Sequence, residues 1–269
     1  MRNIKLIVTD LDGTLLRSDK TISNYTVDIL SRCRDRGIKL ALATARGPRG
    51  AQRMIELLSP DFFIGHGGAV VLAGDDVIHT VDIPSDITHR LINCFLNTPE
   101  ITAIYLSNES DSLTNDPDAV SLHSDWAHIQ YTDFSVIPDG PFQKISVECS
   151  DLSAVERIAA DFPLFELMCF TGEDFYIFAH RNATKNHGVK AVAAHLGITA
   201  GEIAAFGDNN IDIDMITGCC VGIAVGNAIP EVKAVADYIC GSNDEDGVAK
   251  WIAGMILDPT RGGNAVKDG

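Results

Sequence analysis

Short apolar runs alternate with amphipathic segments over the first 81 residues and again from about residue 182 onward. The runs are rich in Val, Ile, Leu and Ala, which is typical of strands buried on both faces, and the segments between them have the apolar spacing of helices. This alternation predicts a parallel sheet with right-handed helical crossovers. The predicted strands are residues 4–8, 38–44, 62–64, 202–206, 221–225 and 238–240, with a hairpin of 69–72 and 77–81; the predicted helices are 23–36, 49–58, 185–196, 211–217 and 230–236, followed by a last helix that contains Trp251 and Ile252.

The block from residue 82 to about residue 180 has a different pattern, and its middle, residues 108–140, is polar and typical of long loops. We therefore expect two domains: an α/β core formed by residues 1–81 and 182–269, and a separate α/β domain formed by residues 82–181. In the second domain the pattern predicts helices over 85–96 and 151–160 and strands over 103–107, 144–148, 165–169 and 175–178.

With 269 residues, 46% of them hydrophobic, the chain is long enough for one large or two modest folded domains. Its net charge of −16 argues against nucleic acid or an anionic membrane as a partner, because both require clustered Lys and Arg. The charge is compatible with a small anionic substrate, which a metal ion and a lysine can neutralise locally. The sequence carries no signal of an oligomeric state.

The chain has seven cysteines, an odd number without any Cys-x-x-Cys spacing. They are typical of small buried side chains in a reducing compartment. The apolar run after Arg2 and Lys5 is too short for a secretion signal and is interrupted by Asp10, and no segment reaches the apolar length of a membrane span. We therefore expect a soluble cytoplasmic protein.

Two carboxylates follow the first predicted strand directly. Asp10 and Asp12 are two positions apart, so in an extended chain they share a face, and Gly13 supplies a sharp turn after them. Open α/β sheets bind ligands at the carboxyl ends of their strands. The pair is compatible with an ordinary acidic turn, but it also looks like a phosphoryl-transfer site.

A second acidic segment follows the predicted strand 202–206. Asp208 and Asp212 stand where that strand leads into a helix, and carboxylate oxygens are the ligands that Mg²⁺ prefers. The spacing also suggests a calcium-binding EF-hand loop. That alternative fails because Ile213 stands where the loop requires glycine and Cys219 where it requires glutamate.

Phosphoryl transfer also needs hydrogen-bond donors and cations around the phosphoryl oxygens. Thr44 ends the second predicted strand, and Arg46 follows it; a capping hydroxyl and a solvated surface charge are the simpler interpretations of these residues. Lys185 begins a predicted helix, where a positive charge is disfavoured by roughly 0.3–1 kcal/mol. A bound phosphate would explain the lysine, whereas a freely solvated side chain is the alternative.

Residues 10–16, Asp-Leu-Asp-Gly-Thr-Leu-Leu, resemble the first motif of the phosphatases among the haloacid dehalogenase-like hydrolases. The segment 207–212 resembles their fourth motif, and residues 221–228 and 244–249 resemble the Cof-type branch. The resemblance implies a Rossmann-like doubly wound parallel sheet. It also implies that residues 82–181 form the inserted cap domain of the C2 type, as in subclass IIB.

Two positions depart from the pattern of that family. Ile211 stands where an asparagine is usual, so the amide's hydrogen bonds are missing there, and Asn210 is a candidate substitute one position away. Gly67 replaces another asparagine in the segment Gly65 to Ala69, where His66 is a candidate substitute. Both departures bear on how metal and substrate are held.

The resemblance implies a Mg²⁺-dependent phosphomonoester hydrolase that acts on small phosphorylated metabolites, such as sugar phosphates or phosphorylated cofactors, through an aspartyl-phosphate intermediate. A phosphomutase or phosphotransferase with the same intermediate is an alternative, and so is a non-catalytic phospholigand-binding relative, which Ile211 favours. The implied roles are Asp10 as nucleophile, Asp12 as general acid and base, Asp10, Asp12, Asp208 and Asp212 around Mg²⁺, Thr44 and Lys185 on the phosphoryl oxygens, and Arg46 and Asn210 as further substrate contacts.

Overall fold

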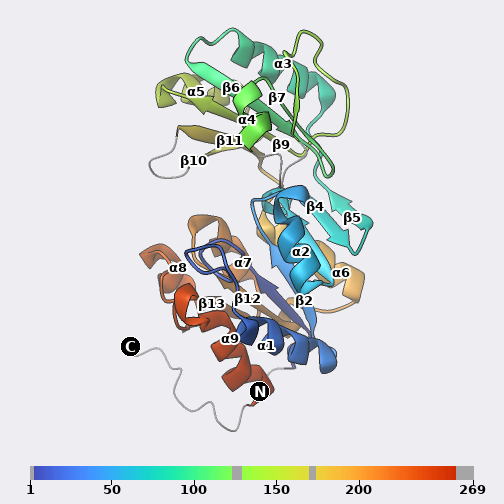
Figure 1. Cartoon of the computed structure of the whole chain (residues 1–269), viewed down its shortest axis with the longest axis vertical. Helices are drawn as coiled ribbons and strands as arrows, with labels where there is room; N and C mark the ends of the chain where they lie inside the picture. The colour runs from blue at the N-terminus through green and yellow to red at the C-terminus, as the bar shows by residue number, and fades with distance from the viewer. Residues whose placement is uncertain (1–2, 123–128, 170–173, 259–269) are drawn as a thin grey trace. The chain divides into compact units, whose positions relative to one another are not determined.

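A computed structural model describes residues 3–122, 129–169 and 174–258 of the chain. It divides into two compact units (Figure 1). The first consists of Met1–Ala45, Ile55–His79 and Thr184–Gly269, and the second of Arg46–Met54 and Thr80–Ala183. The short segment Arg46–Met54, which the hydrophobic pattern had placed with the core, groups with the second unit. No helix in the described ranges is long and apolar enough to cross a membrane.

The first unit contains an eight-stranded sheet in the order β14-β13-β12-β1-β2-β3-β4-β5. The pairs from β14 to β3 are parallel, and β4 runs antiparallel to β3. The predicted parallel sheet and its terminal hairpin are therefore confirmed. The strands are β1 (Leu6–Thr9), β2 (Lys39–Ala43), β3 (Phe62–Gly65), β4 (Val70–Ala73), β5 (Asp76–Thr80), β12 (Ile203–Gly207), β13 (Val221–Ala224) and β14 (Tyr238–Ile239).

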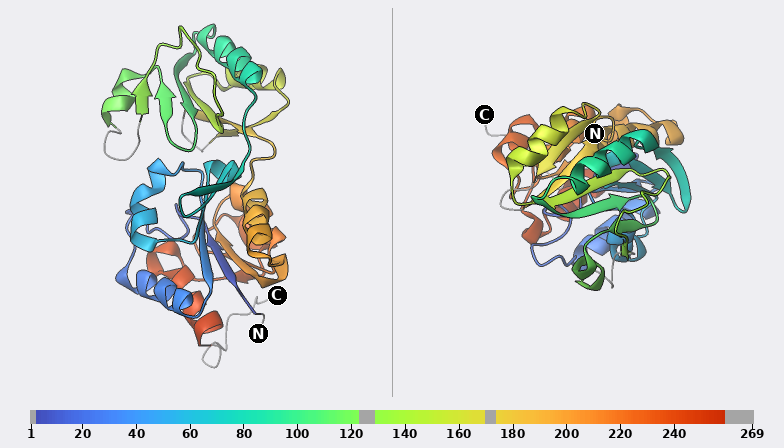
Figure 2. Two further views of the ribbon diagram at one scale, coloured as in Figure 1. Left: turned by 90° about the vertical axis from the view of Figure 1, so that its right-hand side faces the viewer. Right: turned by 90° about the horizontal axis from the view of Figure 1, so that it is seen from above.

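Helices cover both faces of this sheet. On one face Val189 and Met215 pack with Leu6 and Val8, and on the other Trp251 packs edge-on against Phe206. The side view of Figure 2 shows the helix coloured blue (α1) and the orange helix (α6) on opposite sides of the strands. The helices are α1 (Asn24–Asp35), α2 (Gln52–Leu58, at the junction of the units), α6 (Lys185–Leu196), α7 (Ile213–Gly218), α8 (Pro230–Val235) and α9 (Gly247–Ile252), with short 3-10 turns at Arg49–Ala51, His66–Gly68, Ala200–Glu202, Asn210–Asp212 and Asn243–Glu245 and a π-helical end at Ala253–Leu257.

Local sequence explains where α6 begins and ends. Thr184 caps its first turn by accepting a hydrogen bond from the backbone N–H of His187. Gly197 ends the helix in the left-handed conformation, at φ 64°, as the sequence predicts. β1 lies at the centre of the sheet and is buried on both faces. Its residues are accordingly three apolar side chains, Leu6 to Val8, and one buried threonine, Thr9.

The second unit contains a six-stranded sheet in the order β10-β11-β9-β6-β7-β8. It is antiparallel except for the β7–β8 pair. Phe95 and Val155, from its two longest helices, pack into a core with Phe178 and Val147 of the sheet. The elements are α3 (Ser85–Leu96), β6 (Ile101–Ser107), β7 (Ser112–Thr114), α4 (Pro117–Leu122), β8 (Ile129–Tyr131), β9 (Lys144–Cys149), α5 (Leu152–Ala160), β10 (Phe165–Cys169) and β11 (Phe175–His180).

Three short elements, β7, α4 and β8, lie in the polar segment that the pattern predicts as loop. Tertiary pairing explains them. The hydroxyls of Ser107 and Ser112 are hydrogen-bonded at 2.8 Å across β6 and β7, and Asn115 accepts a bond from the backbone of Ile104. Such short strands have too few apolar positions to be visible in the sequence.

Gly188 allows α6 to lie close to β3, because a Cβ at this position would overlap Ile64 Cγ2. We expect Gly188→Ala to lower the free energy of unfolding by about 1–3 kcal/mol, through overpacking, in urea denaturation. Gly254→Ala is the matched control, since its Cβ would have no atom within 4 Å. Equal stability of the two variants would contradict the close packing of α6.

Candidate active site

Four chain segments meet at the carboxyl edge of the first unit's sheet. Asp10 follows β1, Asp208 follows the neighbouring strand β12, and Thr44 follows β2 on the other side. The backbone N–H of Asp10 donates to Phe206 O at 3.0 Å, which ties the ends of β1 and β12 together. Lys185, the first residue of α6, completes the group.

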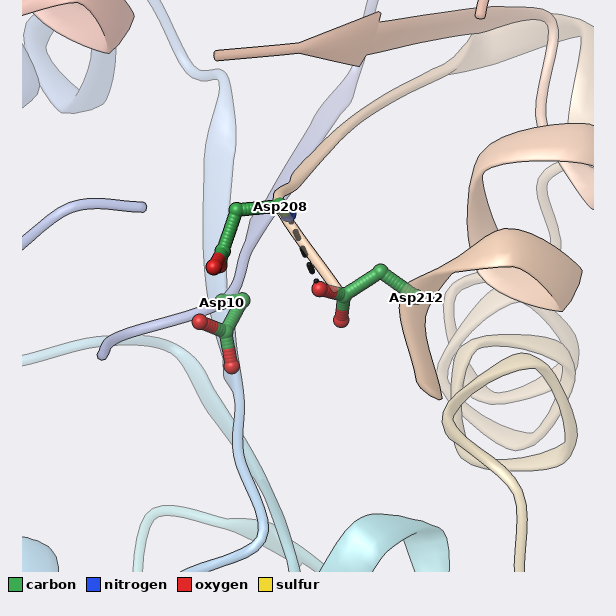
Figure 3. Close-up of side chains that lie close together, drawn as sticks. All are labelled: Asp10, Asp208 and Asp212. Atoms are coloured by element: carbon green, nitrogen blue, oxygen red, sulfur yellow. Dashed lines mark hydrogen bonds between the residues drawn. The ribbon is translucent and has the colours of Figure 1, made fainter. Parts of the chain in front are cut away.

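The side chains of Asp10, Asp208 and Asp212 point toward one another (Figure 3). Each offers a carboxylate oxygen, and the three oxygens lie within 4.8 Å of one another. Asp10 is 5% exposed and Asp212 is 1% exposed. The convergence of positions 10, 208 and 212, which the motifs predict, is therefore present in the structure.

Lys185 is fully buried beside these carboxylates. Its Nζ donates to Asp10 Oδ1 at 2.6 Å and to Asp212 Oδ1 at 2.5 Å. Burial by itself lowers the pKa of Lys185, but the neighbouring Asp10 and Asp212 carboxylates outweigh it and raise the pKa above its usual value. The lysine is charged, and the two carboxylates explain why a cation begins this helix.

One ammonium does not balance three carboxylates. The pKa of Asp10 is raised to about 8, mainly by burial; Lys185 opposes this rise, and Asp212 and Asp208 contribute to it. Burial also raises the pKa of Asp208, against the opposing hydrogen bond from Thr14. Since a further positive charge would relieve this repulsion, and since the donors are carboxylate oxygens, the residues fit a divalent cation such as Mg²⁺.

The two oxygens of Asp212 are already engaged. Oδ1 accepts from Lys185, and Oδ2 accepts from the backbone N–H groups of Asp208 and Asn209, both at 3.0 Å. Gly207 leaves the space for this arrangement, because a Cβ there would overlap the Asp212 side chain. Asp212 is thus suited to orient Lys185 and the turn that carries Asp208.

Thr14 is a residue of the site that sequence reasoning missed. Its hydroxyl donates to Asp208 Oδ1 at 2.6 Å, while a Cβ on the adjacent Gly13 would come within 2.6 Å of Asp208 Oδ2. In the sequence Thr14 appears only as one residue of the motif 10–16, and nothing in that motif indicates that its hydroxyl contacts Asp208. The turn after β1 therefore holds Asp208 as well as ending the strand.

Asp12 lies outside the group of three carboxylates. Its side chain is one-third exposed, and its Oδ1 accepts from Lys20 Nζ at 2.9 Å. Lys20 was also missed by sequence reasoning, because nothing in its local pattern points back to Asp12. The carboxylate of Asp12 is therefore partly accessible to solvent.

Thr44 is buried, and its backbone joins the loop after β3 to the site. Its N–H donates to Ile64 O, and its carbonyl accepts from Gly67 N–H, both at 2.9 Å. Gly67 has φ 70°, a conformation that favours glycine. Gly68, at φ 111°, lies so close to Thr184 that a Cβ would overlap its carbonyl. The glycines therefore place Thr44 and the start of α6 next to each other.

The two remaining predicted substrate contacts stay predictions. Arg46 groups with the second unit, where its Nη1 donates to Gly50 O at 3.1 Å. Asn210 is exposed, and its backbone N–H donates to Asn209 Oδ1 at 2.7 Å.

Comparison with known proteins gives the family. The family model of the haloacid dehalogenase-like hydrolases matches residues 7–252. The chain is 30% identical over 260 residues to a Haemophilus influenzae protein named "Putative phosphatase", a match that covers 91% of this chain and 95% of that protein. It is 28% identical over 273 residues to the Yersinia pestis protein named "HMP-PP phosphatase", with 95% of this chain and 96% of that protein covered.

Solved structures agree with this. The fold matches a haloacid dehalogenase-like hydrolase from Bacteroides thetaiotaomicron with a TM-score of 0.82 and 26% identity, over 94% of this chain and 100% of that one. A sugar phosphatase of subclass IIB has the same fold, with a TM-score of 0.79 and 23% identity, over 93% of this chain and 98% of that one. The protein belongs to the haloacid dehalogenase-like hydrolases. Within them it is a phosphatase, as the motifs predict.

We expect Lys185→Met to destabilise the protein, because it leaves Asp10 and Asp212 buried without a cation. The free energy of unfolding in urea and EDTA should fall by about 3–5 kcal/mol. Mg²⁺ should restore part of the loss, since a cation that binds the folded state stabilises it by mass action.

Lys5→Met is the control for this measurement. It breaks the exposed pair of Lys5 and Glu202, and its loss should be much smaller and unaffected by Mg²⁺. Equal losses in the two variants, or a Lys185→Met loss that Mg²⁺ leaves unchanged, would contradict the charge balance described above.

Proposed function

We propose that this phosphatase is a Mg²⁺-dependent phosphomonoester hydrolase that works through an aspartyl-phosphate on Asp10. One observation carries the proposal: a buried carboxylate held by a buried ammonium, with Asp208 and Asp212 close by, at the carboxyl edge of a parallel sheet. An oriented carboxylate can act as a nucleophile toward phosphorus. The positive charge of the Lys185 ammonium contributes to the electrostatic stabilisation that phosphoryl transfer needs.

In the first half-reaction an oxygen of Asp10 bonds to phosphorus while the bond from phosphorus to the ester oxygen breaks. Asp12 gives its proton to that departing oxygen, so the product leaves as an alcohol. Lys185 donates to the Asp10 carboxylate and so orients it. In this proposal Lys185 and Thr44 also donate to the phosphoryl oxygens. Transfer of the phosphoryl group leaves Asp10 phosphorylated and Asp12 deprotonated.

In the second half-reaction Asp12 removes a proton from a water molecule as the water oxygen attacks phosphorus. The bond between phosphorus and Asp10 breaks, inorganic phosphate leaves, and both carboxyl groups return to their starting states. A bound Mg²⁺ supplies the positive charge that offsets repulsion between the anionic nucleophile and the anionic substrate. Asp10, Asp208 and the backbone carbonyl of Asp12 are the groups we expect to hold it, with Asp212 in support.

Small phosphorylated metabolites, such as sugar phosphates or phosphorylated cofactors, are the substrates we propose. The names of the relatives support this class, since one is named an HMP-PP phosphatase and another a sugar phosphatase.

Residues 82–181 would act as a C2-type cap domain, and Arg46 and Asn210 as substrate contacts. A cytoplasmic location, expected from the cysteines, and the absence of nucleic-acid partners, expected from the net charge of −16, belong to the same proposal.

The first test is release of inorganic phosphate from a generic phosphomonoester. We expect turnover with Mg²⁺, none after EDTA treatment, and a loss of about 10³-fold or more in Asp10→Asn. Asp61→Asn, which changes a carboxylate paired with Lys39 away from the site, should keep full activity. Turnover that requires a second alcohol and yields the phosphate ester of that alcohol in place of inorganic phosphate would indicate a phosphotransferase instead, and normal turnover in Asp10→Asn would show that Asp10 is not the nucleophile.

Asp12→Asn tests the proton-transfer role separately. Turnover should fall by about 10²–10⁴-fold, the usual contribution of general acid–base catalysis. Mg²⁺ affinity, measured by calorimetric titration without substrate, should stay close to that of the wild type because the backbone carbonyl is unchanged. If the variant lost metal binding to the same extent as turnover, Asp12 would be a metal-site residue rather than the acid and base.

A further inference from the structure

The turn that follows Asp12 is fastened to a segment more than two hundred residues away in the chain. Asn227 Nδ2 donates to Gly13 O at 2.7 Å, and Asn243 Nδ2 donates to Leu16 O at 2.9 Å. The two asparagines are themselves linked, since Asn243 N–H donates to Asn227 Oδ1 at 2.9 Å. Asn243 is buried, so its hydrogen bond connects the middle of the turn to the interior of the first unit, while Asn227 holds the beginning of the turn.

The next residues of the turn are held by charged groups. Arg17 makes a bidentate pair with Asp246: Nη2 lies 2.9 Å from Oδ2, and Nε lies 3.3 Å from Oδ1. Ser18 donates to Asp244 through both its backbone N–H and its hydroxyl, each at 2.8 Å. Asp246 has φ 58°, a conformation uncommon for a residue with a side chain, and its Oδ1 also accepts from Thr26. We call Asn227, Asn243, Asp244 and Asp246 the loop clamp.

The clamped turn, residues 13–20, touches two groups of the proposed reaction. Asp12 begins it, and Lys20 at its far end donates back to the Asp12 carboxylate. Gly13 and Thr14 both contact the carboxylate of Asp208. A shift of this turn would therefore move the acid and base and would also move a candidate metal ligand.

The first part of the turn is held by its own contacts, since Leu15 and Leu16 are buried and both donate their backbone N–H groups to Leu11 O. The far part depends more on the clamp. Ser18, Asp19 and Lys20 are exposed. A planar bidentate arginine pair restricts sliding and rotation more than a single contact does, and the buried amide of Asn243 cannot shift without losing its partner. Because a misplacement of about 1 Å can lower a rate about 10²-fold, such fixation has a large effect on turnover.

We propose that the loop clamp is a positioning device for the reaction: through Arg17 and Gly13 it holds the turn so that Asp12 and Asp208 keep their working positions. The proposal rests on the proposed function. It assigns a role to Asn243, Asp244 and Asp246, which lie in the short segment that leads into α9.

Arg17→Met and Arg17→Lys are the variants for the test, with Lys39→Met as the matched control. Lys39 and Asp61 form a salt bridge in the same unit, at the end of β2 away from the site. Their side chains are 46% and 19% exposed, similar to the 36% and 14% of Arg17 and Asp246. We expect Arg17→Met to lower kcat about tenfold, with KM changed much less, while its urea midpoint matches that of Lys39→Met. Arg17→Lys should restore part of kcat, because it keeps the charge but not the bidentate geometry.

Asn227→Ala tests the connection from the clamp to Asp208 without relying on turnover. It removes the hydrogen bond to Gly13 O, so the affinity for Mg²⁺, titrated without substrate, should weaken about tenfold, as for other residues that orient metal ligands. Arg17→Met and Lys39→Met with equal kcat would overturn the positioning role, and an unchanged Mg²⁺ affinity in Asn227→Ala would overturn the link to Asp208. If the wild-type protein hydrolyses no phosphomonoester, the proposed function itself fails, and the Mg²⁺ titration then tests the clamp alone.

Discussion

The site depends on one buried ammonium. Lys185 lies between Asp10 and Asp212, and without it the segments that follow β1 and β12 would bring carboxylates together with no ammonium to offset their repulsion. A buried ion pair contributes modestly to stability compared with apolar packing, but the removal of one partner leaves an uncompensated charge. The pair is therefore better understood as a constraint on geometry: it holds the Asp10 carboxylate in one orientation, which a nucleophile needs.

The sheet makes this convergence possible. Parallel neighbours end at the same edge, so residues that follow β1, β2 and β12 meet although they are distant in the chain. Close packing then sets their separations. Gly188 lets α6 approach β3, Gly68 lets the loop after β3 approach Thr184, and together they bring Lys185 within reach of the carboxylates.

Much of this could be predicted from the sequence because it is local or periodic. The parallel sheet, the helix that begins at Lys185 and the acidic ends of two strands all follow from apolar spacing and motif strings. What could not be predicted depends on contacts between distant segments. The bond from Thr14 to Asp208 spans 194 positions and that from Arg17 to Asp246 spans 229, and neither residue shows a pattern that names its partner. The strands β7 and β8 were missed for the same reason, since pairing rather than apolar periodicity forms them.

The two departures from the family pattern differ in their local backbone. Gly67 has φ 70°, and its N–H donates to the carbonyl of Thr44. A glycine tolerates that conformation without strain, so the loop after β3 can approach Thr44 closely. At position 211 the side chain is apolar, and the turn there is stabilised by Asp212, whose carboxylate accepts from two consecutive backbone N–H groups. The first departure therefore fits the backbone conformation of its loop, and the second leaves the orientation of Asp208 to Asp212 and to the clamped turn after β1.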